Sequence, residues 1–263
     1  KAIEFVTANK DKPFFLYLPH SMPHIPLFVP KDVHDPNPKN AYKCVIEHID
    51  AEVGRLVQSV RDLGLANNTY IIFTSDNGPW IRFKHHGGSA FPLRDGKGTT
   101  FEGGQRVPCV MWGPGRIPAG TTSTALSSTL DLLPTLTALS GAKLPGEVRT
   151  DGYDLTKTVT GDAPSPRNEL VYYSAMGALE GIRQGDWKLL VKKARVHQGK
   201  KGSKARKPGA NKPRILLFNL AADLSETTNL ANKNPERVKA LQARMKELDN
   251  EITANARPVW RKK

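Results

Sequence analysis

The segment TYIIFTSDNGPW, Thr69 to Trp80, begins as an apolar, β-branched run and ends in a carboxylate, an amide and a Gly-Pro turn. Thr69 to Ser75 predict a strand that is buried on both faces, because polar residues do not alternate with the apolar ones. Ligands of open α/β sheets collect at the carboxyl ends of the strands. Asp76 and Asn77 follow this strand directly, so we expect them at such an end.

Two interpretations of Asp76 and Asn77 are open at this point. A carboxylate and an amide carbonyl are hard oxygen donors, which suit Ca²⁺ or Mg²⁺ better than a soft metal. Asp-Asn-Gly is also ordinary turn chemistry, in which the two side chains bond local backbone and Gly78 takes a positive φ. The tetrapeptide alone does not decide between a metal site and a turn.

The first 168 residues alternate predicted strands and helices, which favours an α/β architecture with a largely parallel sheet. Apolar residues recur every three or four positions from about Asn40 to Leu63, typical of an amphipathic helix that Gly64 ends. The other elements predicted in this part are strands at Phe14–Leu18 and Val107–Trp112 and a helix at Leu130–Gly141, with Asp131 placed to cap it.

The pattern changes beyond residue 168. The segments LVYYSA, ALEGIRQ, WKLLVKK and RILLFNL are short and strand-like, are joined by turns such as Gly185-Asp186, and precede a helical pattern from Pro235 to about Ala254. We therefore predict a smaller antiparallel sheet with one helix packed across it. The two predicted units are residues 1–168 and 169–263.

Composition limits the partners. The chain has 263 residues, of which 38% are hydrophobic, enough for one large domain or two smaller ones. It contains no window of about 18 uncharged apolar residues, so we expect no membrane span. Ten Lys or Arg and no Asp or Glu lie between Lys192 and Arg214, and this basic insertion accounts for most of the net charge of +14. It lacks aromatic residues to stack on bases, so it favours a solvated loop, or an arm that holds a polyanion, over a specific nucleic-acid site.

Two further segments carry candidate site residues at predicted strand ends. Lys97 lies in the glycine-lined loop PLRDGKGTTFEGGQRVP, where backbone can approach a ligand closely and the lysine can neutralise an anionic oxygen. His20 and His24 lie in PHSMPHIP, where an imidazole could protonate a leaving group. Such residues are ordinarily surface or structural ones. Their occurrence at three strand ends together with Asp76 favours a common site.

These segments resemble a known family. PFFLYLPHSMPHIPLFVP, YIIFTSDNGPW, SAFPLRDGKGTTFEGGQRVP, STLDLLPTLTALSG, GIRQGDWKLL and LFNLAADLSETTNLA resemble, in order and spacing, the type I sulfatases, arylsulfatase-like members of the alkaline phosphatase superfamily. The resemblance covers nearly the whole chain. It implies that residues 1–168 are the carboxy-terminal part of a catalytic α/β domain with a central mixed sheet flanked by helices, and that residues 169–263 form a small antiparallel-sheet subdomain.

The resemblance also implies roles for individual residues. Asp76 and Asn77 would be ligands of a Ca²⁺ ion, in preference to Mg²⁺. Lys97 would contact the sulfate and His24 the ester oxygen, so both would be catalytic and substrate-binding residues. The remaining assignments are His85 and His86 as substrate contacts, His20 as a structural residue, and Glu102 with Arg106 as a buried ion pair that holds the loop.

One part of the family pattern is missing. The family requires a cysteine in a C-x-P-x-R segment, which is converted to formylglycine and attacks sulfur. Cys44 is followed by Val-Ile-Glu-His and Cys109 by Val-Met-Trp-Gly, so neither fits. The chain therefore resembles the carboxy-terminal half of a sulfatase, with formylglycine expected in the amino-terminal half. Alone, the chain should bind metal weakly, expose apolar surface and show no turnover.

The activity expected of the complete protein is hydrolysis of a sulfate ester, such as that of a sulfated polysaccharide. Two alternatives stay open: a phosphonate or phosphodiester hydrolase of the same superfamily, and a non-catalytic relative that binds anions. The resemblance also implies export to a periplasm or the cell exterior, or to a lysosome in a eukaryote.

Overall fold

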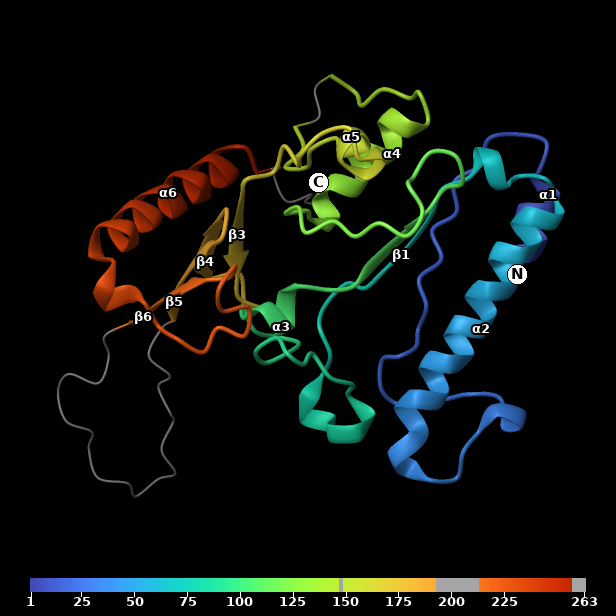
Figure 1. The fold of residues 1–263 in the computed structure, drawn as a ribbon, viewed down its shortest axis with the longest axis horizontal. Coiled ribbons are helices and arrows are strands. Elements are labelled where there is room, and N and C mark those ends of the chain that lie inside the picture. Colours follow the sequence, from blue (N-terminus) through green and yellow to red (C-terminus); the bar gives the residue numbers. More distant parts are fainter. Residues whose placement is uncertain (147–148, 193–212, 257–263) are drawn as a thin grey trace, which may run out of the picture.

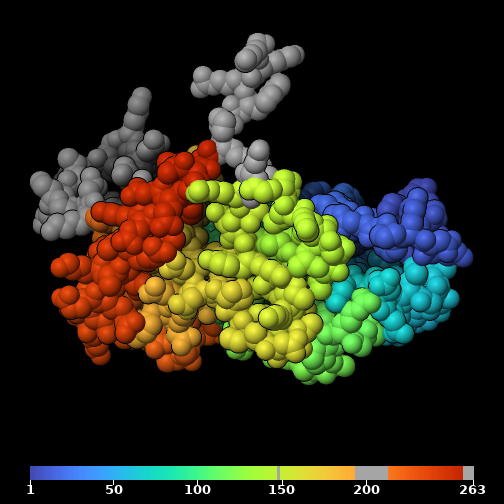
Figure 2. Space-filling view, turned by 90° about the horizontal axis from the view of Figure 1, so that it is seen from above, coloured from blue at the N-terminus to red at the C-terminus, as the bar shows by residue number. Residues whose placement is uncertain are grey.

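The computed structural model describes residues 1–146, 149–192 and 213–256. Most of the basic insertion predicted at 192–214 lies outside these residues. The elements follow one another along the long axis of the molecule (Figure 1). Helices α1 and α2 lie at one end, the β1–β2 ribbon lies in the middle, and a four-stranded sheet with helix α6 lies at the other end. Figure 2 shows the same succession on the surface, from blue through green to red.

The predicted amphipathic helix is confirmed as α2, Ala41–Asp62, and it packs against α1, Ala2–Ala8. Val45, Ile49 and Val60 form its buried stripe. Gly64 follows the helix with a φ of +72°, a conformation that glycine adopts without steric cost. Short 3-10 helices flank α2: η1 (Lys31–Val33), η2 (Pro38–Asn40) and η3 (Ala66–Asn68).

Strands β1, Ile71–Thr74, and β2, Cys109–Trp112, pair antiparallel, with Ile71 opposite Trp112 and Thr74 opposite Cys109. The α/β class is confirmed, but the prediction of a largely parallel sheet is wrong for this pair. A parallel neighbour needs a crossover that carries the chain back along the sheet. The connection between β1 and β2 holds only η4 (Ile81–His86) and α3 (Glu102–Gln105), so β2 runs back beside β1. Phe73 is 40% exposed, so β1 is not buried on both faces as predicted.

The predicted strand at Phe14–Leu18 is also wrong. In the described part of the chain this segment pairs with no strand, and Phe15 and Tyr17 are 70% and 78% exposed. Apolar and aromatic side chains favour an extended backbone, but a strand also needs a neighbour for its ladder of hydrogen bonds. The exposure agrees with the expectation that this chain alone leaves apolar surface uncovered.

The predicted helix near residues 130–141 is confirmed as α4, Leu132–Leu139, and Asp131 occupies its N-cap position, but the Asp131 side chain makes no capping hydrogen bond to α4. Ser128 caps the preceding turn η5, Thr129–Asp131, and Asp131 closes that capping box by accepting the N–H of Ser128. The Asp131 carboxylate is buried and lies 2.5 Å from Arg167. It therefore ties the start of α4 to the segment that leads into the small sheet. A short helix, α5 (Thr156–Thr160), packs near α4.

The small antiparallel sheet is confirmed, with strand order β3-β4-β5-β6. Its strands are β3 (Glu169–Tyr173), β4 (Leu179–Gln184), β5 (Trp187–Lys192) and β6 (Arg214–Asn219). Gly185-Asp186 forms the β4–β5 turn, and η6 (Ala231–Lys233) precedes α6, Pro235–Ala254, whose predicted bounds match. The helix packs Leu241 and Met245 against Ile182, Leu189 and Leu217, so it covers one face of the sheet (Figure 1).

The other face of the small sheet receives the glycine loop, which we define as residues 92–106. Phe101 of this loop packs against Leu190, Leu216 and Phe218. Lys188 has no exposed side-chain surface, and its ammonium lies 2.8 Å from Oε1 of Glu102 and 3.0 Å from Oε1 of Glu226. The loop is therefore held by an apolar contact and by an ion cluster inside the protein.

Glu102 and Glu226 differ in their electrostatic surroundings. Burial opposes the ionisation of Glu102, but the charges of Lys188, Arg106 and Arg183 outweigh it and hold its pKa below the ordinary value. The predicted ion pair of Glu102 with Arg106 is present at 2.9 Å, but it is buried only on the side of Glu102, because the Arg106 side chain is 40% exposed. Burial raises the pKa of Glu226. Its Oε2 accepts the backbone N–H of Glu102 at 2.6 Å, whereas its Oε1, although close to Lys188, has no partner with hydrogen-bond geometry in the described structure.

Replacing Lys188 by Met should lower the free energy of unfolding by about 3–5 kcal/mol, because it leaves two buried carboxylates without their shared ammonium. The double variant Lys188→Met/Glu226→Gln should lose less, since one of those carboxylates becomes neutral. Urea denaturation of both variants and the parent measures the difference. Equal losses in the two variants would contradict the pairing described here.

Candidate functional site

The polar end of β1 is bound to the glycine loop by main-chain contacts. The N–H of Gly78 donates to the carbonyl of Gly104 at 3.2 Å, and the N–H of Lys97 donates to the carbonyl of Pro79 at 2.9 Å. A Cβ atom at Gly78 would lie 1.8 Å from the carbonyl oxygen of Gly103. Glycine is therefore required at position 78 for close approach, and this approach brings Asp76 and Asn77 next to the loop that carries Lys97.

Lys97 and Asn77 line one pocket, of about 270 Å³. The ammonium of Lys97 lies 4.9 Å from the centre of the Trp80 ring, a cation–π contact. No salt bridge to Lys97 occurs in the described ranges. Within the described chain, the other lining residues carry no acidic group: Gly98, Thr99, Gly104, Gln105, Tyr173, Ser174 and Ala175. A cation in a neutral polar lining suits an anionic ligand.

His24 meets the same tryptophan. Its ring centre lies 5.7 Å from that of Trp80, and its Nδ1 lies 2.7 Å from the carbonyl oxygen of Ile25. A carbonyl only accepts, so we assign the proton to Nδ1, which leaves Nε2 to exchange a proton with a ligand. Trp80 therefore connects the predicted catalytic residues His24 and Lys97, each through a direct contact with its ring.

Asp76 and Asn77 do not make the local turn bonds that were the alternative interpretation. In the residues described, neither side chain makes a hydrogen bond to the neighbouring backbone, and Gly78 does not have a positive φ. Their oxygens are of the kind that a hard cation prefers. They are only two side chains, and no group of three or more His, Cys, Asp or Glu in residues 1–146, 149–192 and 213–256 is arranged to hold a metal ion.

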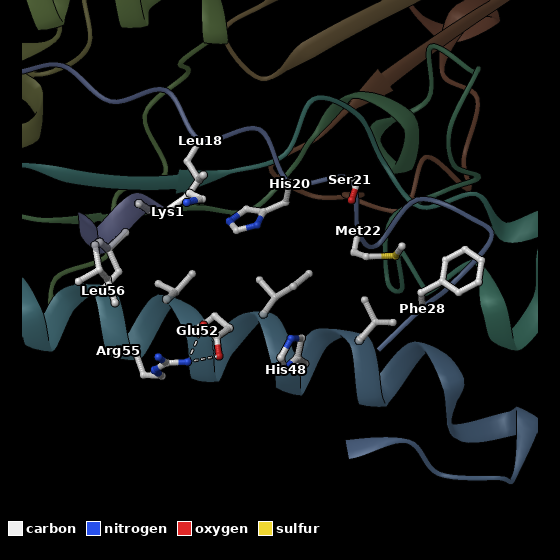
Figure 3. A pocket seen from close by; sticks show the side chains of 15 residues that line it. Lys1, Leu18, His20, Ser21, Met22, Phe28, His48, Glu52, Arg55 and Leu56 are labelled. Atoms are coloured by element: carbon white, nitrogen blue, oxygen red, sulfur yellow. Dashed lines mark hydrogen bonds and ion pairs between the residues drawn. The ribbon is translucent and has the colours of Figure 1, made fainter. Parts of the chain in front are cut away.

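None of the predicted histidines is among the described lining of this pocket: His24 reaches it only through Trp80, and Asp76 likewise lies outside the lining. His86 is on η4, with Nε2 3.0 Å from the carbonyl oxygen of Pro38, so it ties η4 to η2. His85 packs edge-on against His86, with ring centres 4.8 Å apart. His20 lines a different pocket, of about 360 Å³, between the segment at residues 18–28 and α2 (Figure 3). In that pocket the guanidinium of Arg55 donates a hydrogen bond of 2.8 Å to Oε1 of Glu52.

Several residues near the site were missed by the sequence analysis. Trp80 ends the segment that begins with β1, but an aromatic residue after a turn gives no signal of a cation contact. Tyr173 and Ser174 come from the small sheet, and no local pattern places them beside Lys97. The sequence pattern predicts Lys188 to be an ordinary surface lysine within a strand. Each of these contacts joins segments far apart in the chain, which is why the local pattern does not show them.

Solved structures define the class of protein. The crystal structure of the PsFucS1 sulfatase from Pseudoalteromonas sp. matches with a TM-score of 0.79 and 26% identity, covering 96% of this chain and 51% of that one. The crystal structure of Ps i-CgsB in complex with k-i-k-neocarrahexaose matches with a TM-score of 0.78 and 29% identity, covering 98% of this chain and 55% of that one. The fold is therefore an α/β sulfatase fold.

Family models give the particular assignment. The model described as Sulfatase matches residues 1–142, and the model described as the C-terminal region of aryl-sulfatase matches residues 165–261. The chain belongs to the sulfatase family, which confirms the resemblance seen in its motifs.

Curated relatives agree with the family. Bovine arylsulfatase A is 38% identical over 245 residues, which are 89% of this chain and 48% of the relative. Human arylsulfatase A is 36% identical over 269 residues, 96% of this chain and 52% of the relative. Dog N-acetylgalactosamine-6-sulfatase is 35% identical over 191 residues, 72% and 36% of the two chains. The chain spans about half the length of the arylsulfatase A relatives.

Each helix within the ranges that the structure describes is too short or too polar to traverse a lipid bilayer.

Replacing Gly78 by Ala should lower the free energy of unfolding by about 1–3 kcal/mol, because the added methyl group collides with backbone that cannot move aside independently. Gly54 on α2 is the matched control, since a Cβ atom there meets nothing within 4 Å. Gly54→Ala should raise stability by about 0.5–1 kcal/mol, as glycine is unfavourable inside a helix. Chemical denaturation measures both, and a Gly78→Ala protein as stable as the parent would refute the close approach.

Proposed function

We propose that the protein hydrolyses sulfate esters and that the pocket of Lys97 binds the sulfate group. The observation that carries the proposal is the position of Lys97: it is a cation in a pocket whose described lining holds no acidic side chain, and Trp80 connects it to the imidazole of His24. Membership of the sulfatase family and the names of the relatives support the same activity.

Sulfate-ester cleavage builds negative charge on the bridging oxygen as the bond to sulfur breaks. Lys97 would bind and orient the anionic sulfate. His24 would act at the ester oxygen: when its ring is protonated, Nδ1–H stays bonded to Ile25 and Nε2–H is free to pass a proton to the leaving group. Lys97 would therefore stabilise charge, and His24 would transfer the proton.

Asp76 and Asn77 fit a Ca²⁺ ion in kind, and we propose them as part of its ligand set. Such an ion takes about six to eight oxygen ligands, so these two side chains would hold it only with further donors. When bound, it would polarise the sulfate oxygens as a Lewis acid. Formylglycine does not fit the cysteines of this chain: Cys44 lies on α2, Cys109 lies on β2, and neither is in a C-x-P-x-R segment. No residue of this sequence is therefore assigned as the nucleophile.

Sulfated carbohydrates are the substrate class that we propose. The name N-acetylgalactosamine-6-sulfatase and the oligosaccharide bound to Ps i-CgsB support this class. A basic insertion at 192–214 would attract a polyanionic substrate, and its loss should reduce retention on immobilised heparin. We also keep export to a periplasm, lysosome or cell exterior as part of the proposal.

Replacing Lys97 by Ala in the product of the complete reading frame should lower kcat/KM for 4-nitrophenyl sulfate about 100-fold, the typical effect of removing one preorganised donor to developing charge. Lys239→Ala on α6, an exposed lysine remote from the pocket, is the matched control and should leave the rate within about two-fold. Release of 4-nitrophenol measures both variants.

The same assay separates the alternatives. Faster turnover of 4-nitrophenyl phosphate than of the sulfate would favour a phosphoester hydrolase. Anion binding without turnover of either ester would favour a non-catalytic relative. The 263-residue chain by itself stays predicted to be inactive, and Lys97-dependent turnover by that chain would contradict this prediction.

A further inference from the structure

The pocket of Lys97 has a second wall that comes from the small sheet. Tyr173 ends β3, and Ser174 and Ala175 begin the turn to β4. All three line the pocket together with residues of the glycine loop. The proposed function assigns the sulfate to Lys97 and says nothing of this wall. What this wall binds depends on the proposed function, because the sulfate at Lys97 sets which part of the ligand faces it.

The hairpin is irregular where it meets the pocket. Tyr172 pairs with Gly181 but Tyr173 pairs with Leu179, so Glu180 is an extra residue on β4, a β-bulge. Bulges re-aim side chains and are frequent beside active sites. Oε2 of Glu180 accepts the hydroxyl of Thr100 at 2.8 Å and the ammonium of Lys192 at 2.6 Å. The bulge therefore bonds the hairpin to the glycine loop and fixes one wall of the pocket relative to the other.

Tyr173 is a fixed part of this wall. Its hydroxyl donates to Oδ1 of Asp249 on α6 at 2.7 Å. Burial and this hydrogen bond raise the pKa of Tyr173 to about 12, so the hydroxyl stays protonated and bonded to the helix. Tyr173 thus contributes shape and has no proton left to donate to a ligand.

Ser174 and Gln105 have the free hydrogen-bonding capacity. Oγ of Ser174 accepts the N–H groups of Met176 and Ala178 at 3.3 and 3.1 Å, which leaves its own proton to donate. Nε2 of Gln105 donates to the carbonyl of Thr99 at 2.8 Å, and Oε1 accepts no hydrogen bond from the part of the chain that the structure describes. One donor and one acceptor serve a hydroxyl group, which itself donates and accepts.

We propose that Ser174 and Gln105 are specificity-determining residues that bind a hydroxyl group next to the sulfate held by Lys97. Lys97 is the single charged residue among the described residues of the lining, so the wall matches a neutral polyol with one sulfate. The described lining offers no second cation to pair with a carboxylate or a second sulfate on the same unit. A volume of about 270 Å³ lies just below the roughly 300–1,000 Å³ of most small-molecule sites, as expected for one sugar unit.

The test compares two probes on the product of the complete reading frame: galactose 6-sulfate, which has hydroxyl groups, and inorganic sulfate, which has only the anion. Ser174→Ala should lower the affinity for galactose 6-sulfate about 5- to 10-fold, the effect of losing one hydrogen bond, and leave the affinity for inorganic sulfate unchanged. Ser174→Thr keeps a hydroxyl and should retain most of the affinity. Competitive inhibition of 4-nitrophenyl sulfate hydrolysis at constant salt measures the apparent affinity for both probes, since a competing ester and an inert anion both inhibit competitively, and thermal unfolding verifies that each variant folds.

Ser123→Ala is the matched control, because Oγ of Ser123 also accepts a backbone N–H two residues on, from Ala125, away from the pocket. It should leave both affinities unchanged. Equal weakening of the two probes by Ser174→Ala, or no weakening of either, would overturn the role of the wall. Parent protein that binds sulfate but binds galactose 6-sulfate no more tightly would also overturn it, with the proposed function intact. Parent protein that binds neither probe would overturn the proposed function and this inference together.

Discussion

The buried ammonium of Lys188, shared by Glu102 and Glu226, is the interaction on which the arrangement of the site depends. Removing an ion from water costs several kcal/mol even after relaxation, and only good pairing recovers this cost. Glu102 belongs to the glycine loop, Lys188 to β5, and Glu226 to the segment between β6 and α6. The loop cannot leave the sheet without separating buried charges. The cluster therefore fixes where the loop lies more than it adds net stability.

That constraint passes to the site through the backbone. Glu102 is followed by Gly103 and Gly104, whose carbonyls meet Gly78, and the backbone of Lys97 is bonded to Pro79. The end of β1 and the glycine loop are thus one unit. The ion cluster attaches this unit to the small sheet. A side chain on any of these glycines would open the contact. This explains why a lysine in a glycine-rich loop can be held in place rather than move with the solvent.

The sequence predicted best what local periodicity controls: α2, α6 and the four strands of the small sheet. It failed where long-range contacts decide. Phe14–Leu18 has the composition of a strand but no neighbouring strand among the residues described, and the Asp131 side chain at the N-cap of α4 bonds Ser128 and Arg167 instead of the helix. Lys188 looks like a surface residue because its partner Glu102 is 86 positions away. Position at predicted strand ends made His24, Lys97 and Asn77 candidates, and the family resemblance supplied the roles that stay proposals. Trp80 lies in one of the family motifs but was given no role, Ser174 lies in none, and the domain division at residue 168 stays a prediction.

The two walls of the pocket differ in range and selectivity. Lys97 attracts any small anion, since Coulomb attraction falls slowly with distance and does not depend on what the anion is attached to. Ser174 and Gln105 act only at hydrogen-bond distance and distinguish a hydroxyl from its absence. A fully buried pair of this kind would reject the wrong ligand strongly, because its polar groups would be left without partners. Ser174 is half-buried and Gln105 is exposed, so water replaces a missing hydroxyl at small cost. Discrimination between ligands by Ser174 and Gln105 is therefore modest. Lys97 provides the stronger contribution to binding, and that contribution does not distinguish one anion from another.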